Sequence, residues 1–65
     1  MRYTSEQIEK NILAFMEDTN QYEIVHVIAY CLGYYGYITN QIWNVILDLK
    51  YKKGRIDPQD PHGNV

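Results

Sequence analysis

The side chains that could perform chemistry in this chain are few, and their spacing does not assemble an enzyme site. Cys31 is the single cysteine, and it falls among apolar residues, where a thiol behaves as a small hydrophobic group with a raised pKa. No second group stands at a spacing that would activate it. The sequence also lacks a glycine-rich phosphate loop, an HExxH pair and paired carboxylates with room for a cleft. We therefore expect no enzyme activity, no cofactor and no small-molecule substrate.

Two histidines are the remaining candidates for a metal ligand or a pH switch. His26 lies one turn from Glu23 on a narrow polar strip, a position typical of a structural histidine. His62 lies near Asp57 and Asp60, but in a stretch rich in proline that lacks the clustered ligands of a zinc site. We expect neither histidine to bind a metal.

A basic cluster near the end of the chain is the one feature that could attract nucleic acid. It consists of Lys50, Lys52, Lys53 and Arg55. Residues 1–48 carry six acidic and two basic side chains, whereas residues 50–65 carry four basic and two acidic ones, so the net charge of −2 is unevenly distributed. Attraction to phosphates would depend on this cluster alone, although cations at a helix end also complement the helix dipole and favour solubility.

Length and composition predict one small domain. A chain of 65 residues with 46% hydrophobic content builds a core that supplies only about 3–5 kcal/mol of stability, so help from a partner or a second copy is plausible. The first residues lack the layout of a signal peptide, and the longest apolar stretch, 24–32, is shorter than the roughly 20 residues of a membrane span. We expect a cytoplasmic protein that does not enter a membrane.

The first predicted helix begins at Ser5 and runs to about Asp18. Thr4 and Gln7 have the spacing of a capping box, in which each side chain bonds the backbone amide of the other residue. The predicted core face consists of Ile8, Ile12, Phe15 and Met16.

The second predicted helix is capped by Asn20, with Glu23 at the matching position, and ends at Gly33. More than half of its circumference is apolar, through Ile24, Val25, Val27, Ile28, Cys31 and Leu32. A helix that is apolar on most sides belongs in the middle of a domain.

The third predicted helix is capped by Thr39, continues to Tyr51 or Lys52 and stops before Gly54. Its core ridge consists of Ile42, Val45, Ile46 and Leu49. Trp43, Leu47 and Tyr51 lie four apart and form a second apolar ridge, which is either covered by the rest of the chain or used as an interface. Residues 57–65 are polar and carry two prolines, so the prediction is a three-helix domain over 1–56 followed by a flexible tail.

The segment 39–56 resembles the third helix and following strand of winged-helix and helix-turn-helix regulators, and the order of elements extends the likeness over roughly residues 5–56. A capping Thr39 precedes the apolar ridge, and Gly54 and Ile56 follow it where that family begins its wing. The tyrosine-rich turn 33–37 is longer than a helix-turn-helix link, and the chain turns polar where a complete wing needs two strands. The implied fold is all-α, with three helices in a helix-turn-helix or truncated winged-helix arrangement.

Two functions follow as hypotheses. The first is a non-enzymatic regulator that works by protein contact, as a homodimer or by docking on a larger host protein in the style of small phage inhibitors and adaptors. Its contact residues would be Trp43, Leu47 and Tyr51 with Tyr34, Tyr35 and Tyr37.

The alternative, which the resemblance implies, is a DNA-binding transcriptional regulator. Asn40, Gln41 and Asn44 would approach bases, and Lys50, Lys52, Lys53 and Arg55 would approach phosphates. Asp48 and Leu47 on the outward face of the same helix disfavour this alternative, since a groove lined with phosphates repels the first and gains little from the second.

Overall fold

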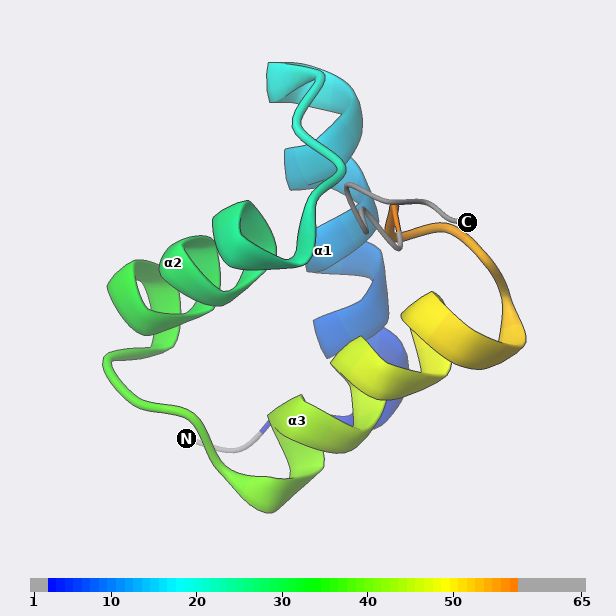
Figure 1. Ribbon diagram of the computed structural model, residues 1–65. Coiled ribbons are helices and arrows are strands. Elements are labelled where there is room, and N and C mark those ends of the chain that lie inside the picture. Colours follow the sequence, from blue (N-terminus) through cyan, green and yellow to red (C-terminus); the bar gives the residue numbers. More distant parts are fainter. Residues whose placement is uncertain (1–2, 58–65) are drawn as a thin grey trace.

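The computed structural model describes residues 3–57 and shows an all-α fold, as predicted. Helices α1 (Ser5–Thr19), α2 (Ile24–Tyr35) and α3 (Asn40–Leu47) follow one another, and a π-helical turn, η1 (Asp48–Lys52), continues α3 without a break. Figure 1 shows α2 and α3 lying on one side of α1. Of the predicted tail, 57–65, all residues after Asp57 lie outside the described residues.

Helix α1 begins where the capping pattern predicts. The Gln7 amide donates to the Thr4 hydroxyl at 3.1 Å, and the Thr4 amide donates to the Gln7 side chain at 2.9 Å, so the capping box is complete. The helix ends at Thr19, where Asn20 adopts a left-handed conformation with φ of 59°. The prediction that Asn20 caps the next helix is therefore wrong: this residue terminates α1, and Glu23 precedes α2 without a side-chain capping bond.

The end of α2 also differs from the prediction. Gly33 lies inside the helix, and the left-handed turn falls instead on Gly36, with φ of 87°, whose amide donates to the Leu32 carbonyl at 3.0 Å. The extra turn brings Tyr34 and Tyr35 onto the helix, where both rings contact Tyr3 from the segment before α1. These contacts favour a helix that continues through Gly33 and ends at Gly36.

The core lies between α1 and the ridge of α3. Every residue of the predicted α3 ridge is buried, and so are three of the four residues predicted for α1, with Phe15 half-buried at the edge. The buried set is Ile8, Ile12, Met16, Val27, Cys31, Ile42, Val45, Ile46, Leu49 and Ile56.

Helix α2 is not the central helix that its composition predicts. Only Val27 and Cys31 of α2 are buried, while Val25 and Leu32 are 59% and 48% exposed. Two other helices cannot surround a third, so one apolar side of α2 has no cover within the described residues.

After η1 the chain returns to the core instead of forming the strand of a wing. Gly54, with φ of 63°, reverses the chain, and the amides of Arg55 and Ile56 both donate to the Leu49 carbonyl. Ile56 is fully buried, and the Asp57 amide donates to the Tyr22 carbonyl at 2.7 Å. No strand is present over residues 3–57; a single parallel bridge joins Glu23 and Asp57.

Ile56 should therefore be a structural anchor although it follows the last helix. We expect Ile56→Ala to lower the free energy of unfolding by about 2–4 kcal/mol, because it leaves a cavity in a core with little stability to lose. Urea titration followed by circular dichroism measures this. The neighbouring Arg55→Ala, whose side chain is 45% exposed, serves as the control and should change stability by less than about 1 kcal/mol. Equal effects of the two variants would show that Ile56 does not hold the chain to the core.

Candidate partner-binding site

Five aromatic side chains form a connected group along α1 and α2, which we call the aromatic ladder. It consists of Phe15, Tyr30, Tyr34, Tyr35 and Tyr3. Phe15 stacks on Tyr30 with ring centroids 4.4 Å apart, and Tyr30 stacks on Tyr34 at 5.4 Å. Tyr35 meets both Tyr34 and Tyr3 edge to face, at 4.8 and 5.0 Å. Such pairs add stability beyond the area they bury, so the ladder holds α2 against α1 with its tyrosines at the surface.

Of the five residues of the ladder, only Tyr34 and Tyr35 belong to the contact residues predicted from the sequence. Tyr3 was not predicted as a contact residue because its ring partners, Tyr34 and Tyr35, are more than thirty positions away in the sequence. Its position just before the capping box is one where an apolar side chain commonly packs back on the helix. Tyr30 and Tyr34 lie four apart on α2, a spacing that makes neighbours on a helix and could have revealed the stack.

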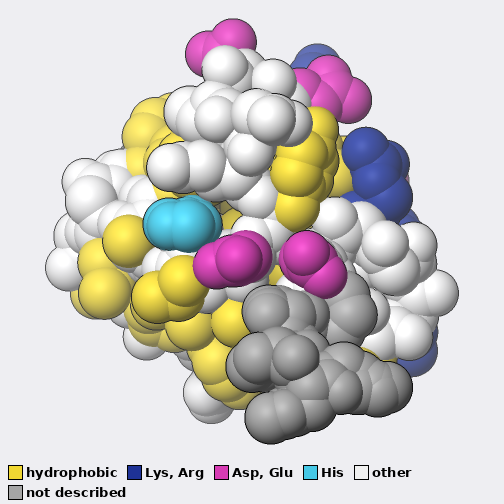
Figure 2. Space-filling view, turned by 45° about the horizontal axis from the view of Figure 1, so that its top comes forward, with side chains coloured by type: hydrophobic (Ala, Val, Ile, Leu, Met, Phe, Trp, Pro, Cys, Tyr) yellow, Lys and Arg dark blue, Asp and Glu magenta, His cyan; other side chains and the backbone are white. Residues whose placement is uncertain are grey.

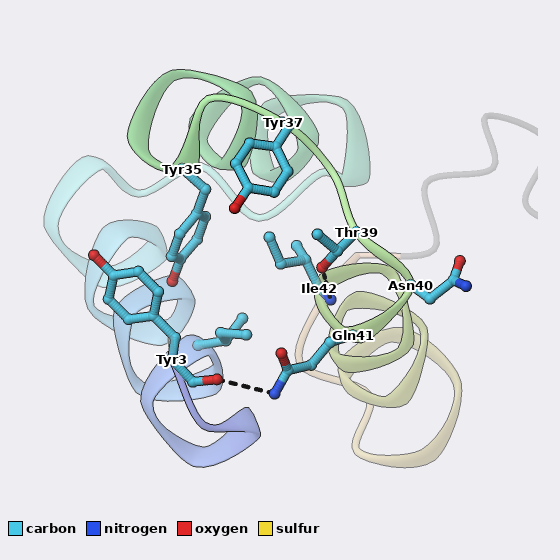
Figure 3. Close-up of a pocket in the computed structure, with 8 residues that line it drawn as sticks. Tyr3, Tyr35, Tyr37, Thr39, Asn40, Gln41 and Ile42 are labelled. Atoms are coloured by element: carbon cyan, nitrogen blue, oxygen red, sulfur yellow. Dashed lines mark hydrogen bonds between the residues drawn. The ribbon is translucent and has the colours of Figure 1, made fainter. Parts of the chain in front are cut away.

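A cavity of about 480 Å³ lies beside the ladder, where the starts of α1 and α3 meet the end of α2. Its lining consists of Tyr3, Ile8, Tyr35, Tyr37, Thr39, Asn40, Gln41 and Ile42. Figure 3 shows tyrosine rings on one side, polar residues of the α3 start on the other, and the hydroxyl of Tyr37 directed inward. Aromatic walls with a few polar groups are the usual lining of a ligand pocket, and this volume falls in the usual range.

Two hydrogen bonds fix the walls of the cavity. The Gln41 side chain donates to the Tyr3 carbonyl at 3.0 Å, which ties α3 to the segment before α1. The Asn11 side chain donates to the Tyr35 hydroxyl at 3.1 Å. Tyr37, 60% exposed, has no hydrogen-bond or ring partner within residues 3–57, so its hydroxyl is available to a ligand.

The second ridge on α3 is only partly formed. Trp43 is 37% exposed, Leu47 is half-buried and Tyr51 is 71% exposed. Tyr51 lies in η1, and because a π-helical turn contains more residues than an α-helical one, it is rotated away from the line through Trp43 and Leu47. The ammonium of Lys50 lies 5.1 Å from the centre of the Tyr51 ring. The structure thus leaves two exposed aromatic side chains here, separated by a helical irregularity.

Most residues that the DNA hypothesis requires already have partners. Lys53 pairs with Glu9 at 2.8 Å, Lys52 with Asp48 at 3.6 Å and Arg55 with Glu17 at 3.9 Å. The hydrogen bond from Lys53 and the charge of Glu9 raise the pKa of Lys53. Exposed ion pairs are weak and can open, but the neighbouring acids reduce the field that a phosphate would meet.

The three residues predicted to contact DNA bases differ in whether their side chains are free. Gln41 is bound to Tyr3, whereas Asn40 and Asn44 are exposed and have no side-chain partner within the described residues.

The thiol of Cys31 and the Nδ1 atom of His26 are both buried. Cys31 is fully buried, and burial raises the pKa of its thiol to about 11. Nδ1 of His26 lies 4.0 Å from a Glu23 oxygen, which is too long for a hydrogen bond, and this atom is buried although the side chain is 43% exposed. Within residues 3–57 no three His, Cys, Asp or Glu side chains come together as a metal site would require. The other candidate ligands, His62 and Asp60, lie outside the described residues.

Comparisons of the chain with models of protein families, with curated proteins and with solved structures gave no significant match. None of the described helices has the length and apolar character that crossing a membrane requires.

The buried thiol should make stability depend on alkaline pH. Its pKa is about 11 in the folded chain against 9.0 for the free group, so the unfolded state loses this proton first. We expect the free energy of unfolding to fall as pH rises from 9.0 to about 11. Denaturant titrations across this range should show a smaller decline in Cys31→Val than in the wild type. Tyr30, whose pKa burial raises from 10.0 to about 12, accounts for a decline common to both proteins. Identical slopes for both proteins would contradict the assignment to Cys31.

Proposed function

We propose that this chain is a small non-enzymatic regulatory domain that binds another protein through the aromatic ladder and the adjoining cavity. The observation that carries the proposal is the exposure of large aromatic side chains at and beside a hollow: Tyr37, which lines it, is 60% exposed, and Tyr34, whose ring meets the lining residues Tyr3 and Tyr35, is 53% exposed. Tyrosine contributes a large ring at low conformational cost and keeps a polar tip in water, which explains its enrichment at interfaces.

The cavity provides a place for an anchoring side chain of the partner. Ile8 and Ile42 give it apolar surface, the tyrosines give it rings for stacking, and the free Tyr37 hydroxyl can donate or accept a hydrogen bond. Binding energy at protein interfaces is concentrated in a few such anchors that fill pockets. Because the capping box and the Gln41 bond fix the surrounding backbone, little order has to be gained on binding.

Trp43 and Tyr51 form a second, smaller surface on α3 and η1 that could contact the same protein partner. Leu47 lies between them in the sequence and is half-buried, so a charge at this position would be partly desolvated. The tyrosine-bordered cavity and the α3 surface can be separated experimentally, since each offers an exposed tyrosine.

We expect Tyr37→Asp to reduce capture of the partner at least tenfold, because the substitution removes a ring from the cavity border and adds a charge that the interface must desolvate. The measurement is an affinity pull-down from the cell of origin, treated with nuclease and quantified by mass spectrometry. Tyr51→Asp makes the same change on the α3 surface and reports whether that surface also contributes. Glu17→Ala, at a side chain 69% exposed, is the neutral control. Undiminished capture by both tyrosine variants, with circular dichroism unchanged, would overturn the proposal.

The exposed Asn40 and Asn44 keep DNA binding as the second candidate function. On this hypothesis, changing Lys52 and Lys53 to Ala weakens binding to all duplexes equally and flattens the salt dependence, whereas Asn44→Ala changes sequence preference. Fluorescence anisotropy with labelled duplexes measures both effects. Absence of binding by the wild-type chain at low salt would end this alternative.

A further inference from the structure

The cavity beside the aromatic ladder has no charged side chain in its lining. Its residues are tyrosines, isoleucines, a threonine, an asparagine and a glutamine. Acidic and basic side chains are common elsewhere on the surface, as Figure 2 shows, so the lack of charge is a property of the cavity and not of the whole chain. A charged group that entered the cavity would lose water without meeting a side chain of opposite charge. An uncharged occupant therefore fits best.

The rings of the lining favour an aromatic occupant. Tyr3 and Tyr35 stand edge to face at 5.0 Å, and Tyr37 lies at the border of the same cavity (Figure 3). Further rings gain attraction beyond the area they bury when they meet such tyrosines edge to face or offset, and Ile8 and Ile42 add apolar surface. The cavity volume of about 480 Å³ favours the largest ring system, because empty space beside a ligand forfeits contacts.

Gln41 gives the cavity a hydrogen-bond acceptor whose orientation is fixed. Its Nε2 atom donates to the Tyr3 carbonyl at 3.0 Å and to the Ser5 hydroxyl at 3.4 Å. An amide nitrogen carries two hydrogens, so both are used, and the amide oxygen has no partner within residues 3–57. Figure 3 shows this oxygen directed into the cavity. The occupant should therefore bring a donor.

The start of α3 does not convert the cavity into an anion site. The Ile42 amide is already bound to the Thr39 hydroxyl at 3.2 Å, and no Lys or Arg belongs to the lining. The Gln41 oxygen would repel an anion at the same place. In addition, α2 ends here, and the negative end of its dipole offsets the positive end of α3.

We propose that the anchor which the partner inserts in this cavity is a tryptophan side chain, with its ring against the tyrosines and its indole N–H donating to the amide oxygen of Gln41. The proposal rests on the function proposed above and names the group by which the partner is recognised. Indole donates one hydrogen bond and accepts none, which matches an oxygen that can only accept.

The other side chains fit less well. Phenylalanine and leucine leave the Gln41 oxygen unpaired, and arginine brings a charge that the lining does not neutralise. Tyrosine can donate, but its smaller ring fills less of the cavity. Tryptophan is also among the side chains that most often carry the binding energy of protein interfaces.

Nuclear magnetic resonance titration of the isotope-labelled chain with N-acetyl-tryptophanamide tests the site. We expect saturable shifts of the Gln41 side-chain amide and the Tyr37 backbone amide, with a dissociation constant of about 1 mM, ordinary for so small a ligand. The same probe with sulfur in place of the indole N–H should bind at least about fivefold more weakly, because it leaves the oxygen unpaired. N-acetyl-argininamide and N-acetyl-leucinamide should be weaker by a similar factor. Equal binding of the tryptophan probe and any of these three would overturn the proposal.

Two variants assign the effect to the proposed contacts. In Gln41→Leu the tryptophan probe and its sulfur analogue should bind equally, whatever the change does to the cavity wall, because the acceptor is gone. Tyr37→Leu should weaken the tryptophan probe at least about fivefold. Tyr51→Leu is the matched control, since Tyr51 is 71% exposed and does not line the cavity, and it should leave binding within about twofold. A preference for the indole N–H that survives Gln41→Leu would contradict the assignment.

The probe and the pull-down report separately on the two proposals. N-acetyl-tryptophanamide at several times its dissociation constant should reduce capture of the partner by more than half, whereas the sulfur analogue at the same concentration should reduce it less. Loss of capture in Tyr37→Asp without a tryptophan preference would leave the proposed function standing and overturn the tryptophan anchor. A tryptophan preference with undiminished capture by the tyrosine variants would do the reverse.

Discussion

Packing of the α1 ridge formed by Ile8, Ile12 and Met16 against both other helices is the contact on which the rest of this fold depends. All three side chains are at most 1% exposed, and α1 contacts α2 and α3 more extensively than these two helices contact each other. The capping box sets the start of this helix, and its start fixes where the segment that carries Tyr3 must lie. Both the aromatic ladder and the wall that Gln41 gives to the cavity follow from that placement.

The same packing determines what remains uncovered. With α1 as the shared neighbour, α2 and α3 each turn one side to the core and one side to solvent. For α3 this division suits the sequence, because its buried side is its aliphatic ridge and its outward side mixes Trp43 with asparagines. For α2 it does not, because Val25 and Leu32 are as apolar as the residues it buries. Helix α2 therefore exposes apolar side chains because it is apolar on most sides, while the arrangement of the three helices buries only one of them.

Local signals in the sequence predicted those features that depend on neighbouring residues. The caps at Thr4 and Thr39 and the buried ridge of α3 are confirmed because a side-chain bond three residues away, or a helical period, involves no distant partner. The boundaries of α2 were wrong because asparagine suits both a helix start and a left-handed end, and because two glycines competed for one stop. Tertiary contacts made by Tyr34 and Tyr35 decided between them.

The candidate site could be predicted only in part, for the same reason. The tyrosines of the turn at 34–37 were identified by their residue type, but the cavity beside them depends on Tyr3 and Gln41, which meet across nearly forty positions of sequence. No periodicity within one helix contains that information. Nor could the pattern show that η1 would rotate Tyr51 out of line, since the four-residue spacing of the predicted ridge assumes an α-helix up to Tyr51.

The charged side chains of this protein are in part paired with one another, whereas several of its aromatic and aliphatic side chains are exposed, and this distribution affects which kind of partner it can bind. The four cations of the basic cluster lie between Lys50 and Arg55, and three of them pair with acidic residues of α1 or of η1 itself. The pairing cancels much of the charge that would draw the chain toward nucleic acid, and it leaves uncharged aromatic and aliphatic areas as the surfaces with most to gain from contact. Since surface ion pairs contribute little to stability, while exposed aromatic rings next to a cavity can contribute strongly to binding, the balance of the surface favours recognition by shape and stacking over long-range attraction.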